Sequence, residues 1–104
     1  MNIYIIGATT PSGKAFLDQS LSQFGSKYIH AYSRFDNKYN FLDLTKPSTY
    51  KNVDLGEDAY IVSFAPIWIF SEFLSIFLSM NLNSNKNIMG VIVCSSSSIE
   101  TKRF

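Results

Sequence analysis

A short glycine-containing segment near the amino terminus holds the residues best suited to chemistry in this 104-residue sequence. It follows the apolar run 2–6 directly and consists of Gly7, Ala8, Thr9, Thr10, Pro11, Ser12 and Gly13. A glycine at the end of a strand permits a tight turn, and small residues let a ligand approach the backbone. A helix beginning at Pro11 would direct free N–H groups and a partial positive charge toward that ligand. The segment therefore predicts an anion-binding turn, with phosphate as the expected anion.

The spacing of this turn departs from the dinucleotide fingerprint G-x-G-x-x-G at one position. Thr10 stands where glycine is usual. Its Cβ would reduce the room for phosphate, whereas its hydroxyl would donate a hydrogen bond to it. Gly13, one turn into the helix, would let the helix pack closely on the strand. The pattern favours a dinucleotide site, and the alternative is a tight turn without a ligand.

The end of the second apolar run bears on which dinucleotide would bind. A site for NAD places Asp or Glu there to hold the ribose hydroxyls, whereas an Arg can meet the 2′-phosphate of NADP. Here Ser33 and Arg34 follow Tyr32, which favours NADP over NAD. Two alternatives stay open: Arg34 is a solvated loop cation, or Asp36 serves NAD.

The elements that must position these residues alternate along the chain. Apolar, β-branched runs predict strands at 2–6, 27–32, 39–42, 59–64 and 88–94, and periodic runs predict helices at 11–24 and 67–80. The segment 47–53 is ambiguous, with a turn of helix after Pro47 as one interpretation. Strands of near-continuous apolar character between helices indicate a parallel sheet covered on both faces. We expect one α/β domain, residues 1–104, with a doubly wound, Rossmann-like sheet in the order 3-2-1-4-5.

The charge and cysteine content exclude several classes of protein. Nine Lys and Arg against eight Asp and Glu give a net charge of +1, without the basic footprint of a nucleic-acid binder. The single cysteine, Cys94, excludes an internal disulfide and a cysteine-rich zinc site, and we predict no metal. The first residues lack the pattern of a signal peptide, so we expect a cytoplasmic protein.

The segment 59–80 raises the question of a membrane span, because Glu72 is its only charge. Pro66 divides it, and serines at 71, 75 and 79 form a polar stripe on a helix. We therefore expect no membrane partner, with a membrane-associated peptide as the minor alternative. Trp68 is expected in the core.

Four segments together resemble a known family. The segment 7–13 resembles the GATGxxG turn of extended and atypical short-chain dehydrogenases/reductases, and 93–98 resembles the serine-rich end of their fifth strand. The segments 41–44 and 62–66 are similar to two stretches that lie along the cofactor. The resemblance covers all 104 residues, is nearer to an NAD-dependent epimerase/dehydratase-like branch, and matches only the N-terminal part of the family domain. It implies that Asp43 contacts adenine.

The resemblance also implies roles for further residues. Leu44, Ala65 and Pro66 would lie along the cofactor, and Ser97 would be catalytic, with Ser96 and Ser98 as alternatives. The family's Tyr-x-x-x-Lys pair is absent, because none of the six tyrosines has Lys four residues later. In that chemistry Tyr transfers a proton, Lys lowers its pKa and Ser orients the substrate oxygen. This chain should therefore not catalyse the complete reaction.

The expected function is binding of NAD(P), with NADP preferred, as the N-terminal part of an oxidoreductase or nucleotide-sugar epimerase/dehydratase-like enzyme whose small-molecule substrate is not identified. The alternative is a non-catalytic Rossmann-fold binding or interaction module. The fifth strand, 88–94, is apolar on both faces, and only ten residues follow it. As a flat apolar edge it predicts a homodimer through that edge, or poor solubility.

Overall fold

The computed structural model describes residues 1–35, 38–80 and 87–94, and the backbone of residues 101–103. The strands are β1 (Asn2–Ile6), β2 (Ile29–Ser33), β3 (Asn40–Phe41), β4 (Ala59–Ser63), β5 (Ile88–Cys94) and β6 (Thr101–Arg103). The α-helices are α1 (Pro11–Phe24) and α2 (Ile67–Met80), and two 3-10 helices are η1 (Ser26–Tyr28) and η2 (Pro47–Asn52). Strands and helices therefore alternate as the apolar runs predict.

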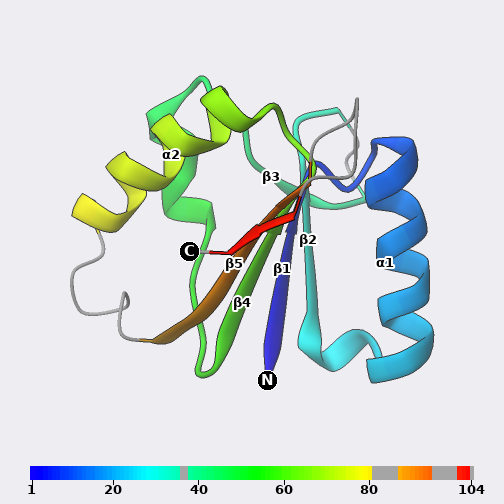
Figure 1. Ribbon diagram of the computed structural model, residues 1–104. Helices are drawn as coiled ribbons and strands as arrows, with labels where there is room; N and C mark the ends of the chain where they lie inside the picture. The colour runs from blue at the N-terminus through cyan, green and yellow to red at the C-terminus, as the bar shows by residue number, and fades with distance from the viewer. Residues whose placement is uncertain (36–37, 81–86, 95–100, 104) are drawn as a thin grey trace.

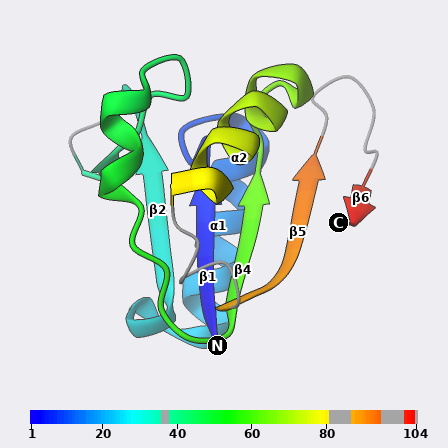
Figure 2. The same ribbon diagram turned by 90° about the vertical axis from the view of Figure 1, so that its left-hand side faces the viewer.

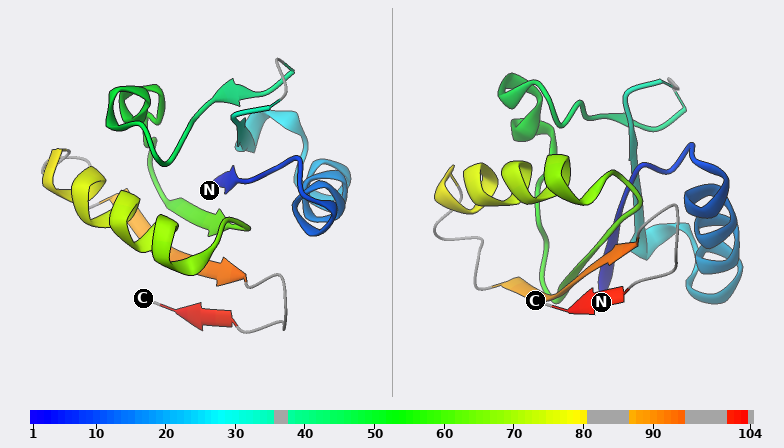
Figure 3. Two further views of the ribbon diagram at one scale, coloured as in Figure 1. Left: turned by 90° about the horizontal axis from the view of Figure 1, so that it is seen from above. Right: turned by 45° about the horizontal axis from the view of Figure 1, so that its top comes forward.

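The strands form one sheet in the order β3-β2-β1-β4-β5-β6. The first five strands are parallel, which confirms the doubly wound α/β fold with the order 3-2-1-4-5. Helix α1 covers one face of the sheet, and α2 with η2 covers the other (Figures 1 and 2). Because the strands are parallel, the loops that follow β1, β2 and β4 leave from the same edge of the sheet. Figure 3 shows that edge from above, between the two helices.

Strand β6 corrects one expectation about the edge of the sheet. It runs antiparallel to β5 and pairs with Ile92, Val93 and Cys94. The prediction that β5 ends the sheet is therefore wrong over these residues, because the chain returns and supplies the missing backbone partners itself. Residues 92–94 of β5 are therefore already paired and are not available as the predicted homodimer interface.

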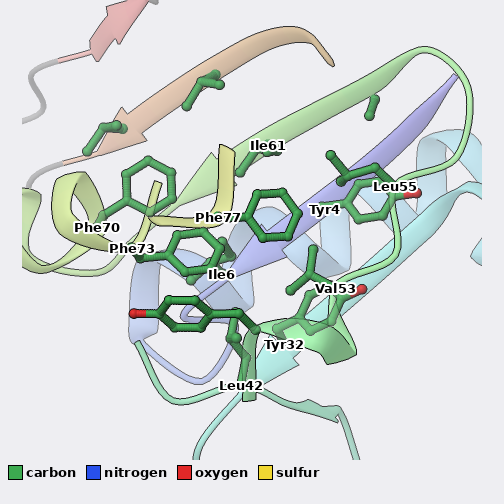
Figure 4. Packing of buried hydrophobic residues seen from close by; sticks show 14 residues of the cluster. Tyr4, Ile6, Tyr32, Leu42, Val53, Leu55, Ile61, Phe70, Phe73 and Phe77 are labelled. Atoms are coloured by element: carbon green, nitrogen blue, oxygen red, sulfur yellow. The ribbon is translucent and has the colours of Figure 1, made fainter. Parts of the chain in front are cut away.

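The core lies on both faces of the sheet. On the α2 side, the rings of Phe70, Phe73 and Phe77 are buried against residues of β1 and β4, as Figure 4 shows. Phe73 meets the ring of Tyr50 edge-on, with centroids 4.7 Å apart. On the α1 side, Leu17 packs with a second cluster from β1, β2 and β4. Both faces are buried, which explains the continuous apolar character of the strands.

Helix ends follow the local signals in the sequence. Helix α1 begins with Pro11 and is followed by Gly25, whose φ of 85° lies in the left-handed region. Helix α2 follows Pro66, whose carbonyl accepts the N–H of Phe70 at 3.0 Å. Three strands differ from their predicted bounds: β2 begins after η1 and covers 29–33, β3 has two residues rather than four, and β4 ends at Ser63. The ambiguous segment after Pro47 forms η2.

The exposed face of α2 is partly as predicted. Glu72 and the serines at 71, 75 and 79 are exposed, which confirms the polar stripe. Trp68 is 75% exposed, so its expected place in the core is wrong. Two residues correspond to about 200° around a helix, so Trp68 lies almost opposite the buried Phe70. Among the described residues, no helix has both the length and the apolar character needed to cross a membrane.

Candidate functional site

A pocket of about 130 Å³ lies at the carboxyl edge of the sheet, where the loops after β1, β2, β3 and β4 meet. Eight residues predicted to contact a cofactor line it: Gly7, Thr9, Thr10, Ser33, Arg34, Asp43, Leu44 and Ala65. Five further lining residues were not predicted: Ile6, Phe35, Leu42, Thr45 and Ile69. The predicted Pro11, Ser12, Gly13 and Pro66 are not in its lining. The pocket therefore unites segments that lie far apart in the sequence.

The turn after β1 depends on two glycines for steric reasons. Gly7 has a φ of +80°, and a Cβ on it would lie 3.4 Å from the backbone of Phe64 and Ala65. A Cβ on Gly13 would lie 2.3 Å from the carbonyl oxygen of Gly7, which no side chain can tolerate. The close packing predicted for Gly13 is therefore a contact with the residue that directly follows β1.

Thr10 closes this turn instead of opening it to a ligand. Its Oγ1 donates to the Gly7 carbonyl at 2.9 Å and accepts the Gly13 N–H at 3.0 Å. Thr10 is thus the N-cap of α1. The hydroxyl proton is used within the turn, so the predicted donation to a phosphate would require the bond to Gly7 to break.

A pair of hydroxyl groups joins the turn to the end of β2. Thr9 Oγ1 and Ser33 Oγ lie 3.1 Å apart, and Ser33 Oγ also accepts the backbone N–H of Phe35 at 3.0 Å. Ser33 is only 4% exposed. One hydrogen bond between two hydroxyls uses one of their two protons. The other proton can be donated to a ligand, since both residues line the pocket.

The opposite charges of the pocket come from Arg34 and Asp43. Asp43 Oδ1 accepts from Thr45 Oγ1 at 2.6 Å and from the Thr45 N–H at 3.0 Å. These two bonds lower the pKa of the Asp43 carboxyl, burial opposes them, and Arg34 and Lys46 add a smaller lowering. The carboxylate is therefore ionised at neutral pH. The Arg34 guanidinium lies over the Phe35 ring, 4.5 Å from its centroid, and remains exposed.

Helix η2 fixes the loop that carries Asp43. Thr49 Oγ1 accepts the Asp43 N–H at 3.1 Å and donates toward the Asp43 carbonyl at 2.9 Å. The Tyr50 hydroxyl donates to the Leu44 carbonyl at 2.6 Å. Both side chains are buried. Helix η2, the segment that is ambiguous in the sequence, thus supports one wall of the pocket. No sequence pattern indicates this role.

The described residues offer binding groups but no activated catalytic group. Burial raises the pKa of Tyr32 to about 12 and also raises the pKa values of Tyr50 and Cys94, so all three stay protonated at neutral pH. No group of His, Cys, Asp and Glu in the described part of the chain could hold a metal ion. The predicted catalytic Ser97, its alternatives Ser96 and Ser98, and Asp36 lie outside the described residues.

The walls of the pocket combine apolar surface with a few polar groups. Ile6, Leu42, Leu44, Ala65 and Ile69 supply the apolar part. Such a site suits a flat ring carrying polar substituents, with an anion near the turn and Arg34. Comparisons with protein-family models, with curated proteins and with solved structures find no match to this chain. The resemblance to short-chain dehydrogenases/reductases therefore stays a prediction from the residues.

Proposed function

We propose that this chain binds NAD(P) in the pocket at the carboxyl edge of the sheet, as the N-terminal part of an oxidoreductase or nucleotide-sugar epimerase/dehydratase-like enzyme. One observation carries the proposal: residues from four separate segments, each predicted to contact a dinucleotide, line a single pocket. The pocket also lies where the strand order reverses, between β1 and β4. Ligands of open α/β sheets bind at that point.

The pocket residues suit the adenosine half of the cofactor. The adenine ring would lie against Leu42 and Ile69, with the Asp43 carboxylate as acceptor for its amino group. The turn after β1 would meet the phosphate, and Ser33 would meet the ribose. When bound, the nicotinamide of the cofactor supplies hydride transfer. The described residues of this chain hold and orient the cofactor.

Two features favour NADP over NAD as the cofactor. Arg34 places a positive charge at the end of β2, and the Thr9–Ser33 pair retains a proton for an acceptor oxygen beside it. A 2′-phosphate would accept from both. Among the described residues, Asp43 supplies the one carboxylate in the pocket lining, and its Oδ1 already accepts two hydrogen bonds from Thr45.

Calorimetric titration with NADPH and NADH tests the proposal. We expect NADPH to bind more tightly, and Arg34→Gln to weaken NADPH by about tenfold while leaving NADH nearly unchanged, since a charge-assisted hydrogen bond is worth about 1.5–3 kcal/mol. Lys27→Gln removes a charge over the Tyr28 ring, outside the pocket lining, and is the matched control. If the folded protein binds neither nucleotide at millimolar concentration, the proposal is wrong.

The second candidate is a non-catalytic binding or interaction module with the same fold. It is supported by the lack of a Tyr-x-x-x-Lys pair in these 104 residues. It predicts binding of the nucleotide without turnover. Hydride transfer by the isolated chain, followed as a change in NADPH absorbance with carbonyl substrates, would exclude it.

A further inference from the structure

We propose that the turn after β1 holds one phosphate group only, so that affinity for NADP comes almost entirely from its adenosine-phosphate half. The inference rests on the proposed function and specifies which part of the ligand is recognised. Thr10 replaces the middle glycine of the usual fingerprint, and its side chain makes contacts that are not expected in a pyrophosphate-binding turn.

The number of backbone donors left in the turn is small. Within residues 7–13, Pro11 has no N–H and three further N–H groups are already bonded. The Ala8 N–H donates to Tyr32 O, and the Thr10 N–H donates to Gly7 O. The Gly13 N–H donates to Thr10 Oγ1. Among the described residues this leaves at most the N–H groups of Gly7, Thr9 and Ser12. Three donors can serve the oxygens of one phosphate. A pyrophosphate presents two phosphate groups and normally draws on the first turn of the helix.

Thr10 is the residue whose side chain occupies the Gly13 N–H, so that this donor is not available to a ligand. The N–H of Gly13, the third residue of α1, would otherwise have no partner within the helix. Thr10 Oγ1 accepts it at 3.0 Å, and the same hydroxyl donates to Gly7 O, which fixes its orientation. A ligand would have to break both bonds to reach the Gly13 N–H.

The nucleoside side of the pocket has the opposite character. There the part-buried Thr9–Ser33 pair keeps one proton for a ligand, Arg34 is exposed, and Asp43 is ionised. The polar groups that remain available for a ligand thus lie toward the ends of β2 and β3. Most of the binding free energy of NADP should therefore come from contacts with its adenosine-phosphate half.

Calorimetry with three probes and two variants tests the inference. The probes are NADP, adenosine 2′,5′-bisphosphate and nicotinamide mononucleotide. For the wild-type chain we expect the first two to bind within about threefold of each other and the third not to bind at millimolar concentration. Thr10→Gly frees the Gly13 N–H, and glycine is nearly as good an N-cap as threonine. It should tighten NADP by about tenfold relative to the bisphosphate, the effect of one charge-assisted hydrogen bond.

Thr10→Ser keeps the hydroxyl and should give the wild-type ratio, and circular dichroism establishes that each variant is folded. NADP binding more than about tenfold tighter than the bisphosphate in the wild type, the effect of at least one further charge-assisted hydrogen bond, would overturn the inference and leave the proposed function standing. An equal effect of Thr10→Gly on both ligands would also overturn it. If neither ligand binds the folded wild-type chain, the proposed function itself is wrong, and the inference with it.

Discussion

The two edges of the sheet differ in how fully their polar groups are paired. At the amino edge, His30 Nε2 lies 3.2 Å from Asn2 Oδ1, and Asn2 Nδ2 donates to the Glu57 carbonyl at 2.7 Å. The Tyr4 hydroxyl accepts the Gly56 N–H at 2.6 Å, and its ring stacks on His30 with centroids 4.6 Å apart. These bonds join β1 and β2 to the segment before β4.

At the carboxyl edge the same strands end in groups that are only partly paired. Thr9 and Ser33 have one proton more than their mutual hydrogen bond uses, and the Arg34 charge lies in an exposed position. Side chains at the amino edge bond to one another and hold the fold together, whereas those at the carboxyl edge keep capacity for a ligand.

The largest expected effect comes from the turn at the carboxyl edge. Gly13→Ala places a Cβ 2.3 Å from Gly7 O, so the turn must shift. We expect a loss of about 3 kcal/mol or more in the free energy of unfolding, because the contact is with backbone that has little room to relax. Urea denaturation followed by circular dichroism measures it.

Gly25→Ala is the matched control, since a Cβ there meets nothing within 4 Å and only the positive φ of 85° is unfavourable. It should cost about 1–2 kcal/mol and leave nucleotide binding unchanged. Equal costs for the two variants would contradict the role assigned to the turn.

An intermediate effect is expected at the amino edge. Tyr4→Phe removes the acceptor of the Gly56 N–H while keeping the buried ring. We expect a loss of about 1 kcal/mol in unfolding free energy, the value of one hydrogen bond, with NADPH affinity unchanged. The same denaturation experiment and a titration measure both. A marked loss of NADPH affinity in this variant would break the division between the two edges.

The smallest effect concerns the pH dependence of stability. Burial lowers the pKa of His30 below its usual 6.5, so the unfolded chain takes up the proton first as the pH falls. The contribution of neutral His30 is full above pH 6.5 and is lost as the pH falls through the lowered pKa. His30→Gln should flatten the stability profile in that window. The Asp43 carboxyl, whose pKa is lowered from 3.8, loses its contribution only in a more acidic window.

Much of the fold and part of the site could be predicted from the sequence for local reasons. Pro11 and Pro66 mark the starts of α1 and α2, and Gly25 marks the end of α1. Alternating apolar runs indicate the strands and helices, and the strand order follows from the doubly wound topology expected of such an alternation. The pairing of β6 with β5 was missed because the three residues of β6 are polar and lack the apolar run from which the other strands were predicted. Trp68 was misplaced because composition cannot tell which side of an apolar helix is buried.

The finer chemistry of the site depends on contacts that the sequence pattern does not reveal. The glycine spacing located the turn, but the direction of the Thr10 hydroxyl follows from the approach of Gly13 to Gly7. The hydrogen bonds from Thr45 to Asp43 require the loop geometry that η2 supports. Ile69 lines the pocket only because of how α2 packs on the sheet.

Backbone amide NMR signals of the isotope-labelled chain, recorded before and after addition of NADPH, show which residues respond to the nucleotide. We predict the largest changes at Gly7, Thr9, Ser33 and Asp43, all at the carboxyl edge. Signals of Tyr4, His30 and Gly56 at the amino edge should stay unchanged. Changes centred on the amino edge, or no change at any amide at millimolar NADPH, would contradict binding of NADPH at the carboxyl edge.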